Sequence, residues 1–364
     1  MRIGLVVYGD LDQVSGGYLY DRKLVEHLEA RGDTVRVFRQ PERPYPGGLV
    51  DNLNFAFWRR LASANLDVLL QDELNHASLA LGNRWLRGQL DAPIVAIVHH
   101  LRAREQQSRP ARALCRLLER LYLRTTDAHI FNSHPTKQSV EALAGRRPSV
   151  VAPPSGRRFG PPVSHATVDE RAQADGPLRL LFVGNLIPRK RLHLLLDGLA
   201  EVPPHQWRLD VVGNPTAAPG YTAALWRRIQ RLDAPSRVAL RGQLPDDALQ
   251  RLLRRSHALA VPSSHEGYGI VYVEAMGHGL PVLASPHGGV RDLVTDGETG
   301  RFVDAPAEIA RAVRRWHRDR DRLAVLGRAA TEAYCATPTW SETGARIASF
   351  LDRLAAPSSA ALRR

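Results

Sequence analysis

The stretch that decides the fold runs from residue 262 to residue 281 and reads PSSHEGYGIVYVEAMGHGLP. An apolar run precedes it, so we expect a buried strand to end at Pro262. A glycine-punctuated loop then opens a helix near Gly269 and Ile270, and this helix is expected to end at Gly277. A strand, a loop, a helix and the next strand in such close succession are typical of a parallel α/β sheet.

The same alternation extends over the whole chain. The strands predicted in the first half are 2–8, 34–39, 67–71, 93–99, 128–132 and 148–152. Those predicted in the second half are 178–184, 208–213, 237–241, 257–261, 281–284 and 300–303. Amphipathic stretches such as 20–31 and 246–255 lie between them. This order of elements favours an α/β protein with two Rossmann-like, doubly wound domains.

The boundary between the two domains is expected in residues 153–177, which are rich in proline, glycine and polar residues and lack apolar periodicity. The predicted domains are therefore 1–165 and 166–340. In open α/β sheets, ligands bind outside the carboxyl ends of the strands. Two such domains facing a central cleft would hold one ligand between them, so the segments that follow the strands are the candidate sites. The tail from residue 355 is expected to fray.

Composition narrows the class of protein. Of the 364 residues, 44% are apolar and 24% are charged, as in an ordinary globular protein, and the net charge is +13. Two cysteines exclude a disulfide framework and a four-cysteine zinc site, and they favour a reducing compartment. Residues 1–10 are typical of a strand rather than a signal peptide, and no apolar run approaches the roughly 18 residues that span a bilayer. We therefore expect a cytoplasmic protein.

In the first half, two strand ends carry candidate residues. Gly16 and Gly17 stand just before a helix, where they let a ligand approach the backbone, or form a simple turn. His99 and His100 end the fourth strand, where a histidine could bind a substrate group, move a proton or merely pack in the core. Residues 10–12 have the letters of an Asp-x-Asp metal motif, although two aspartates that cap a turn are the simpler interpretation.

In the second half, Gly184 and Asn185 follow a strand and lead to the adjacent cations Arg189, Lys190 and Arg191. Three cations at a strand end suit a diphosphate, whereas a solvated basic loop is the alternative.

The 262–281 stretch adds two carboxylates to these candidates. The start of its helix, at residues 269–271, would present backbone N–H groups to an anion. Glu274, one turn further, could accept hydrogen bonds from a vicinal diol such as ribose, and Glu266 could reach whatever the phosphate carries. A glycoside-hydrolase carboxylate pair is the competing interpretation, but that chemistry has no use for a basic phosphate loop.

Together these motifs resemble the retaining glycosyltransferases of family 4, which are glycosyl transferases of group 1 with the GT-B fold. The resemblance rests on the two glutamates separated by seven residues, the early Gly-Gly turn, the Arg-Lys loop and the Pro-His-Gly-Gly-Val run at 286–290. It extends from about residue 2 to residue 354 and is strongest over 262–285. It also implies that a C-terminal helix, about 341–364, crosses back to the N-terminal domain; the apolar stripe within 340–354 fits this expectation.

The resemblance assigns roles to individual residues. The catalytic residues that it implies are His99, Glu266 and Lys190. The donor-binding residues that it implies are Gly16, Gly17, Gly184, Asn185, Arg189, Lys190, Gly269, Ile270, Val271 and Glu274. Tyr18 and His100 are expected on the acceptor side, and neither a metal nor a cofactor is implied. The chain departs from the family at Asn185, where an arginine is usual, and at Arg191, where a glycine is usual. We expect that Arg189 or Arg191 replaces the missing cation, or that the phosphate is held in a different way.

The expected activity is transfer of a hexose from a UDP-, GDP- or ADP-sugar to an acceptor hydroxyl, with retention at the anomeric carbon and by substitution on the same face. The acceptor is left as a sugar, a glycolipid or a small molecule. The alternatives are a sugar-nucleotide epimerase of the same fold, or a non-catalytic protein that binds sugar nucleotides or anionic lipid. Nucleic acid is not expected as a specific partner, because no nucleic-acid-binding motif is present.

An anionic membrane surface is a further candidate partner. Arg112, Arg116, Arg120 and Arg124 recur every four residues within 109–124, opposite a leucine stripe. Residues 55–61, with Phe55, Trp58 and Leu61 beside Arg59 and Arg60, form a second candidate. An ordinary surface helix with a solvated basic face remains the alternative for both segments.

Overall fold

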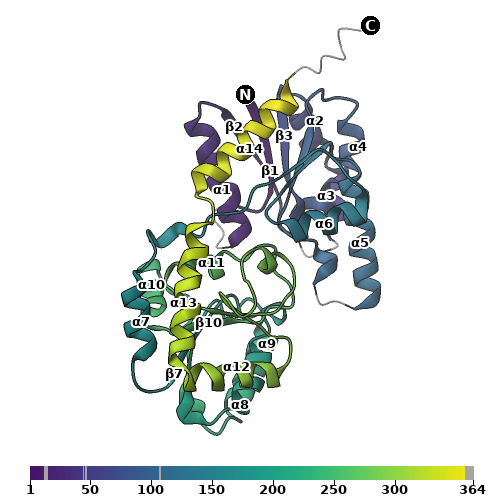
Figure 1. Ribbon diagram of the computed structural model, residues 1–364. Helices are drawn as coiled ribbons and strands as arrows, with labels where there is room; N and C mark the ends of the chain where they lie inside the picture. The colour runs from purple at the N-terminus through teal and green to yellow at the C-terminus, as the bar shows by residue number, and fades with distance from the viewer. Residues whose placement is uncertain (12–14, 44, 46, 106–107, 357–364) are drawn as a thin grey trace. The chain divides into compact units, whose positions relative to one another are not determined.

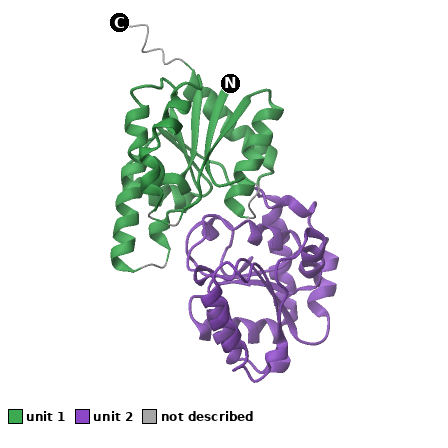
Figure 2. Cartoon of the chain, turned by 180° about the vertical axis from the view of Figure 1, so that it is seen from behind, with its two compact units in different colours: residues 1–154, 338–364 green, residues 155–337 purple. Residues whose placement is uncertain are grey.

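A computed structural model describes residues 1–11, 15–43, 45, 47–105 and 108–356. The chain forms two compact units, shown in Figure 2. Unit 1 comprises residues 1–154 and 338–364, and unit 2 comprises residues 155–337. The boundaries predicted from the sequence, after residues 165 and 340, lie beyond the observed ones, after residues 154 and 337. Each unit is an α/β layer structure with its own sheet (Figure 1).

Unit 1 contains a six-stranded parallel sheet in the order β2-β1-β3-β4-β5-β6. Its strands are β1 Arg2–Tyr8, β2 Thr34–Gln40, β3 Val68–Asp72, β4 Ile94–Val98, β5 Ala128–Phe131 and β6 Ser149–Val151. Its α-helices are α1 Gly16–Ala30, α2 Phe55–Ala62, α3 His76–Leu79, α4 Gly82–Leu86, α5 Arg109–Leu123, α6 His134–Ala144 and α14 Trp340–Ala355. Short 3₁₀ turns are η1 Gly47–Leu53, η2 Glu73–Asn75 and η3 Arg102–Arg104.

Both faces of this sheet are covered by apolar side chains, as a parallel sheet requires. Because successive side chains of a strand point to opposite faces, Ile3, Leu5 and Val7 of β1 enter the core under α1 and α14, whereas Val6 enters the core on the other face. The second core is closed by α2, α4, α5 and α6. The continuous apolar runs in the sequence therefore correspond to strands that are buried on both sides.

Unit 2 contains a second six-stranded parallel sheet, in the order β12-β11-β10-β7-β8-β9. Its strands are β7 Leu178–Val183, β8 Trp207–Val212, β9 Val238–Leu240, β10 Ala258–Val261, β11 Val282–Ala284 and β12 Gly300–Phe302. Its α-helices are α7 His165–Gln173, α8 Leu192–Ala200, α9 Pro219–Ile229, α10 Asp246–Arg255, α11 Ile270–Gly277, α12 Pro306–Arg318 and α13 Arg320–Cys335. Its 3₁₀ turns are η4 Arg157–Phe159, η5 Pro188–Lys190, η6 Pro204–Gln206, η7 Pro235–Arg237 and η8 Gly289–Asp292.

The predicted fold class is confirmed: each of the twelve predicted strands is present, in the predicted half of the chain. Helix α10 has the predicted bounds, whereas α1 begins at Gly16 instead of residue 20 because the Ser15 hydroxyl caps it by accepting a hydrogen bond from the Tyr18 N–H. Of the short helices between residues 47 and 86, only α2 corresponds to a predicted segment, residues 55–61. The others were not predicted, because segments of three to seven residues show little periodicity.

The strand order of each sheet reverses at one point, and ligands bind at such switch points in open α/β sheets. In unit 1 the switch lies between β1 and β3, where the chain leaves in opposite directions. In unit 2 it lies between β7 and β10. The segments after these four strands hold most of the candidate residues.

Helix α14 returns to unit 1, as the sequence predicted, and packs against α1. Thr339 caps it in a capping box with Glu342, and Ile347, Phe350 and Leu351 enter the core beneath it. Gly344 lets the two helices approach closely, because a Cβ atom there would lie 2.3 Å from Cγ of His27.

Two of the side chains expected on a membrane face are instead in the core. Trp58 and Leu61 lie on the buried face of α2, and the Trp58 indole donates a hydrogen bond to the Asn52 carbonyl. Only Phe55 of that trio is exposed. In α5, Leu118 is buried, whereas Leu114 and Leu117 are exposed. Among the described residues, no helix has both the length and the apolar content that crossing a membrane requires.

Candidate functional site

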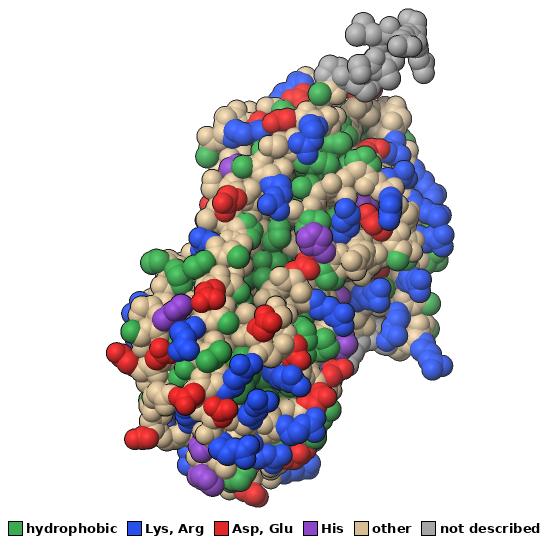
Figure 3. All heavy atoms as spheres, in the orientation of Figure 1, with side chains coloured by type: hydrophobic (Ala, Val, Ile, Leu, Met, Phe, Trp, Pro, Cys, Tyr) green, Lys and Arg blue, Asp and Glu red, His purple; other side chains and the backbone are tan. Residues whose placement is uncertain are grey.

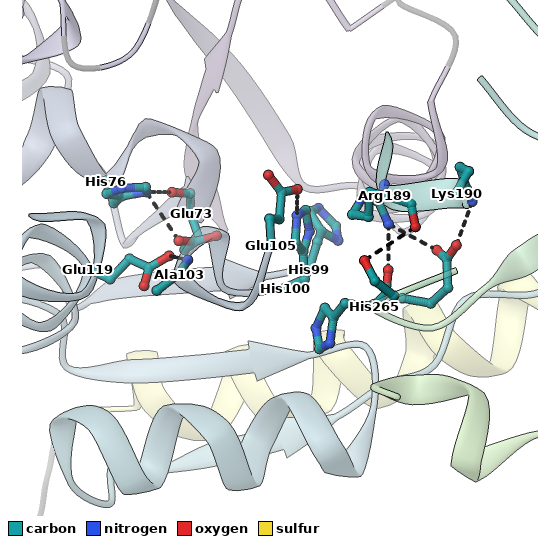
Figure 4. A network of polar contacts seen from close by, with 12 residues as sticks. Glu73, His76, His99, His100, Ala103, Glu105, Glu119, Arg189, Lys190 and His265 are labelled. Carbon is teal, nitrogen blue, oxygen red and sulfur yellow. Dashed lines mark hydrogen bonds and ion pairs between the residues drawn. The ribbon is translucent and has the colours of Figure 1, made fainter. Parts of the chain in front are cut away.

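The switch point of unit 2 brings together two residues that are 76 positions apart in the sequence. Lys190 lies in η5, after β7, and Glu266 lies in the loop after β10. The Lys190 ammonium donates a hydrogen bond to Glu266 Oε1 at 2.6 Å, and Arg189 Nη1 lies 3.4 Å from Oε2. Figure 4 shows Arg189 and Lys190 with these contacts. Two cations therefore share one buried carboxylate.

The charges at this cluster decide its protonation. Burial by itself would raise the pKa of Glu266, but Lys190 and Arg189 together hold it at about 2, so the carboxylate is ionised at every physiological pH. Burial lowers the pKa of Lys190, and the Glu266 carboxylate opposes that shift. Glu266 thus fixes the position of a lysine that would otherwise be costly to bury as a cation.

The third cation of the loop points elsewhere. Arg191 has a left-handed backbone conformation, with φ of 53°, and its guanidinium donates a hydrogen bond to Asp304 at 2.5 Å. Asn185 is exposed. Of the two candidate substitutes for the family arginine, Arg189 is the one at Glu266, where its Nη1 also donates to the His265 carbonyl at 2.7 Å.

Glycines shape both loops around this cluster. A Cβ atom at Gly184 would lie 3.1 Å from Cε of Lys190, so the lysine stem packs directly on that glycine. Gly269, with φ of 100°, is the N-cap of α11, and a Cβ atom there would lie 2.3 Å from the Tyr272 ring. The backbone therefore turns tightly into α11, whose first residues are Ile270 and Val271 as predicted. The N–H groups of a first helical turn have no partner within the helix and favour an anion.

Glu274 lies on α11 and is buried among protein groups. Its Oε1 is 3.1 Å from Nε of Arg158, which also contacts Asp246 at 3.2 Å. Burial raises the pKa of Glu274 to about 7, although Arg158 opposes the shift. Arg158 was missed by sequence analysis because it lies in the proline- and glycine-rich stretch assigned to a linker.

Among the candidate residues of unit 1, Gly17 contacts His99, which follows β4 and is 7% exposed. A Cβ atom at Gly17 would lie 3.3 Å from Cδ2 of His99, so the missing side chain lets the imidazole lie on the first turn of α1. Tyr18 is buried, and its hydroxyl donates to the Tyr8 carbonyl at 2.6 Å. His100 pairs instead with Glu105, at 3.0 Å between Nε2 and Oε1.

Two acidic groups that sequence analysis missed face His99. Asp21 lies one turn after Gly17 on α1, with Oδ1 3.4 Å from Nε2 of His99, and Asp72 ends β3. No local signal marks either residue, since their proximity depends on the order of the strands. Asp12 of the candidate Asp-x-Asp motif lies outside the described residues.

A second group of buried ionisable side chains adjoins the group formed by Asp21, Asp72 and His99, because Glu73 directly follows Asp72. Glu73, His76 and Glu119 are close to one another, and Figure 4 shows His76 with Glu73, and Glu119 with the Ala103 backbone. Burial and the charge of Glu73 raise the pKa of Glu119 to about 7. These three residues have 2% exposure or less, so they lie within the core of unit 1.

Comparison with known families follows this division into units. The model of glycosyl transferases group 1 matches residues 166–333, and the model of a glycosyl transferase 4-like domain matches residues 15–156. Together they account for most of the chain. This chain belongs to the group 1 glycosyl transferases.

The relatives of this glycosyltransferase include D-inositol 3-phosphate glycosyltransferases. That of Nocardia farcinica is 27% identical over 372 residues, which cover 90% of this chain and 82% of the relative. That of Corynebacterium glutamicum is 27% identical over 292 residues, which cover 73% and 69% of the two chains.

Solved structures share the GT-B fold of the transferase. Sucrose-phosphate synthase from Thermosynechococcus elongatus matches with a TM-score of 0.82 and 22% identity over 97% of this chain and 98% of that one. Anabaena HepE in complex with UDP-glucose matches with a TM-score of 0.74 and 21% identity over 97% and 100% of the two chains. At these identities, the likeness shows the fold alone.

Proposed function

We propose that this glycosyltransferase moves a hexose from a nucleoside diphosphate sugar to an acceptor hydroxyl, with retention at the anomeric carbon. The observation that carries the proposal is the largely buried Lys190–Glu266 ion pair beside Arg189, in which Glu266 lies on the loop that leads into α11. This arrangement suits a ligand with a diphosphate on one side and a sugar on the other. The Anabaena relative in fold was solved with UDP-glucose, which makes a UDP-sugar the first donor to test.

The chemistry follows from where charge develops. When the bond between the anomeric carbon and the diphosphate breaks, negative charge appears on the leaving phosphate. Lys190, Arg189 and the α11 N–H groups stabilise it, so we propose that departure needs no metal. The new bond forms between the anomeric carbon and the acceptor oxygen on the same face, and a leaving phosphate oxygen takes the acceptor proton. Glu266 contacts the donor sugar, and Glu274 accepts hydrogen bonds from the ribose hydroxyls.

The acceptor is a sugar, a glycolipid or a small molecule. The names of the relatives make a polyol phosphate such as inositol 3-phosphate the first acceptor to test. Tyr18 and His100 stay on the acceptor side of this proposal.

The proposal is tested by incubating the purified protein with UDP-, GDP- and ADP-sugars in the presence of a chelator. Thermal shift reports binding, and release of nucleoside diphosphate reports turnover. Stabilisation by one nucleotide series, with slow hydrolysis that Glu266→Gln abolishes, supports the proposal. Binding without turnover, with or without acceptors, would identify a sugar-nucleotide-binding protein, and an isomerised sugar product would identify an epimerase. Absence of any shift in a folded sample would overturn the transfer from sugar nucleotides.

Donor binding is expected to strengthen as the pH rises through about 7. Glu274 must be ionised to accept two ribose hydroxyl hydrogen bonds, and its pKa is raised to about 7 by burial. Calorimetric titration of the nucleotide between pH 5.5 and 8.5 should show this dependence in the wild-type protein. Glu274→Gln should bind about tenfold more weakly at pH 8, a loss of about 1.4 kcal/mol, because a neutral amide oxygen accepts weaker hydrogen bonds than a carboxylate; it should also lose the pH dependence. The control is Glu332→Gln, at an exposed position of α13; equal pH profiles for the wild type and Glu274→Gln would contradict the assignment.

We further propose that unit 1 binds an anionic membrane surface. Among the described residues, its exposed large apolar side chains are Val50, Leu53, Phe55, Leu74, Leu81, Trp85, Leu114 and Leu117. Figure 3 shows Lys and Arg side chains gathered along the edge of unit 1 where Figure 1 labels α5. Apolar side chains flanked by arginines suit an interface with acidic lipid headgroups.

Co-sedimentation should therefore show binding to vesicles with phosphatidylglycerol and much weaker binding to vesicles of phosphatidylcholine alone. Leu117→Glu is expected to lower the bound fraction several-fold, because it removes apolar contact and adds a negative charge. Trp226→Glu is the matched control, since Trp226 is similarly exposed but belongs to unit 2. Equal loss in both variants, or no binding to acidic vesicles, would contradict this partner.

A further inference from the structure

Three buried side chains converge at the switch point of unit 1, and each comes from a different element. Asp21 lies on α1, Asp72 ends β3, and His99 follows β4. Asp21 and Asp72 have no exposed surface and His99 is 7% exposed. One polar atom of each lies within 4.8 Å of those of the other two.

The packing around His99 restricts its ring to one orientation. Gly17 supplies the flat surface of α1 on which the ring lies, and the Tyr20 ring meets it edge-on, with centroids 5.2 Å apart and an angle of 82° between planes. The Asn132 amide donates to the His99 carbonyl at 2.8 Å, which fixes the backbone. In this orientation Nε2 faces Asp21 Oδ1 at 3.4 Å.

The cluster holds more acceptors than donors. Both oxygens of Asp21, Oδ2 of Asp72 and Nε2 of His99 are buried without a hydrogen-bond partner. Asp72 Oδ1 accepts a hydrogen bond from the Leu74 N–H at 3.0 Å, but two ionised carboxylates with three unpartnered oxygens beside a neutral imidazole would be costly in this environment. A proton on each ring nitrogen of His99 and a proton on Asp72 make the cluster electrically neutral and supply the missing donors.

The surrounding charges favour that state. Burial alone would lower the pKa of His99, but Asp21, Asp72 and Glu73 raise it to about 9. Burial and the charge of Asp21 raise the pKa of Asp72 to about 7, although His99 opposes that shift. Glu73 is itself paired with His76, so Asp21 is the main counter-charge of His99.

We propose that Asp21 and Asp72 are positioning residues that hold His99 as an imidazolium with Nε2 directed at Asp21, leaving Nδ1–H to donate a hydrogen bond to the substrate. The role of His99 in glycosyl transfer rests on the proposed function. His99 then acts as a donor and not as a general base at neutral pH. This role agrees with a mechanism in which the leaving phosphate takes the acceptor proton.

The protonation state is measured without any activity, by following the imidazole resonances of ¹⁵N-labelled protein against pH and assigning His99 from their loss in His99→Gln. We expect a pKa near 9 that falls by at least one unit in Asp21→Asn and by less in Asp72→Asn. Asp67→Asn is the control, because Asp67 lies on the same unit but pairs with Arg2. A wild-type value near 6.5 would overturn the proposal even if Asp21→Asn failed to fold. A stoichiometric divalent ion found by elemental analysis and lost in Asp21→Asn would also overturn it.

The kinetic readout is the pH profile of kcat. In the wild type kcat should fall as the pH rises through about 9, whereas in Asp21→Asn the midpoint should lie near 6.5. At pH 8 that shift leaves His99 about 30-fold less protonated, so kcat should fall about 30-fold with little change in the KM of the donor. Asp21→Glu should restore most of the kcat that Asp21→Asn loses at pH 8. If His99 titrates as expected but no sugar is transferred, the proposed arrangement around His99 is supported and the proposed reaction is wrong. A folded Asp21→Asn protein with an unshifted pH profile would overturn the positioning role.

Discussion

Lys190→Met is expected to lower kcat for glycosyl transfer by about 100- to 1000-fold, the usual cost of losing one preorganised donor to a developing anion. Methionine keeps the aliphatic stem on Gly184 but removes the ammonium. The change also leaves Glu266 buried with Arg189 as its remaining cation, at 3.4 Å. The unfolding free energy should therefore drop by about 3 kcal/mol, within the range for breaking a buried ion pair.

A double variant separates the two effects. Lys190→Met combined with Glu266→Gln removes both charges, so stability should recover toward the wild type while activity stays low. Lys23→Met is the matched control, because Lys23 makes a Lys–Glu contact of 2.7 Å with Glu26 at the surface. That variant should change stability by less than about 1 kcal/mol and leave kcat unchanged. Recovery of activity in the double variant would show that Lys190 serves only to neutralise Glu266.

Gly288→Ala is expected to lose both stability and activity, because this glycine holds Glu266 in place. Gly288 has φ of 78° and ψ of −151°, a region that is essentially restricted to glycine. A Cβ atom there would lie 2.0 Å from the Glu266 carbonyl oxygen. That same oxygen accepts a hydrogen bond from the Gly289 N–H at 2.8 Å, so the loop cannot accommodate the methyl group without moving Glu266.

The matched control is Gly297→Ala. Gly297 has φ of 80°, but a Cβ atom there meets nothing within 4 Å. Both variants carry the cost of placing an alanine at positive φ, at least about 1–2 kcal/mol. Only Gly288→Ala adds the clash, so denaturant unfolding should find it about 2 kcal/mol less stable than Gly297→Ala. Its kcat should fall about 100-fold, as expected for a misplaced contact of about 1 Å. Equal stability and activity of the two variants would show that the loop adapts without moving Glu266.

The sequence predicted the sheets well because buried parallel strands are recognisable locally. Runs such as residues 94–98 are apolar throughout, and a loop follows each of them. The start of α11 was also visible, since Gly269 and the residues around it leave few conformations other than a tight turn into a helix. The surroundings of the two helices that were candidates for a membrane face were harder to predict, because an amphipathic stripe does not show whether protein, water or lipid covers it. Trp58 and Leu61 proved to be core residues for this reason.

The contacts within the candidate site could not be predicted from spacing. Arg158 and Glu274 are distant in the sequence, and only the packing of η4 against α11 places Arg158 at Glu274. Asp21 and His99 meet only because β1, β3 and β4 lie in that order, with α1 across them. A carboxylate in an amphipathic helix has no local feature that distinguishes a surface residue from the partner of a buried histidine.

The sequence by itself determined the family, the two α/β units and the positions of the strand ends that carry Lys190, His99 and Glu266. These are properties of short segments, where apolar runs, glycines and helix starts restrict the backbone directly. The tertiary structure alone decided which charges meet: Lys190 with Glu266, Arg158 with Glu274, and Asp21 with His99. The physical reason is that these partners come from segments far apart in the sequence. The order of the strands in each sheet and the packing of the helices and turns on it set which of them become neighbours, and burial and neighbouring charges then set their protonation.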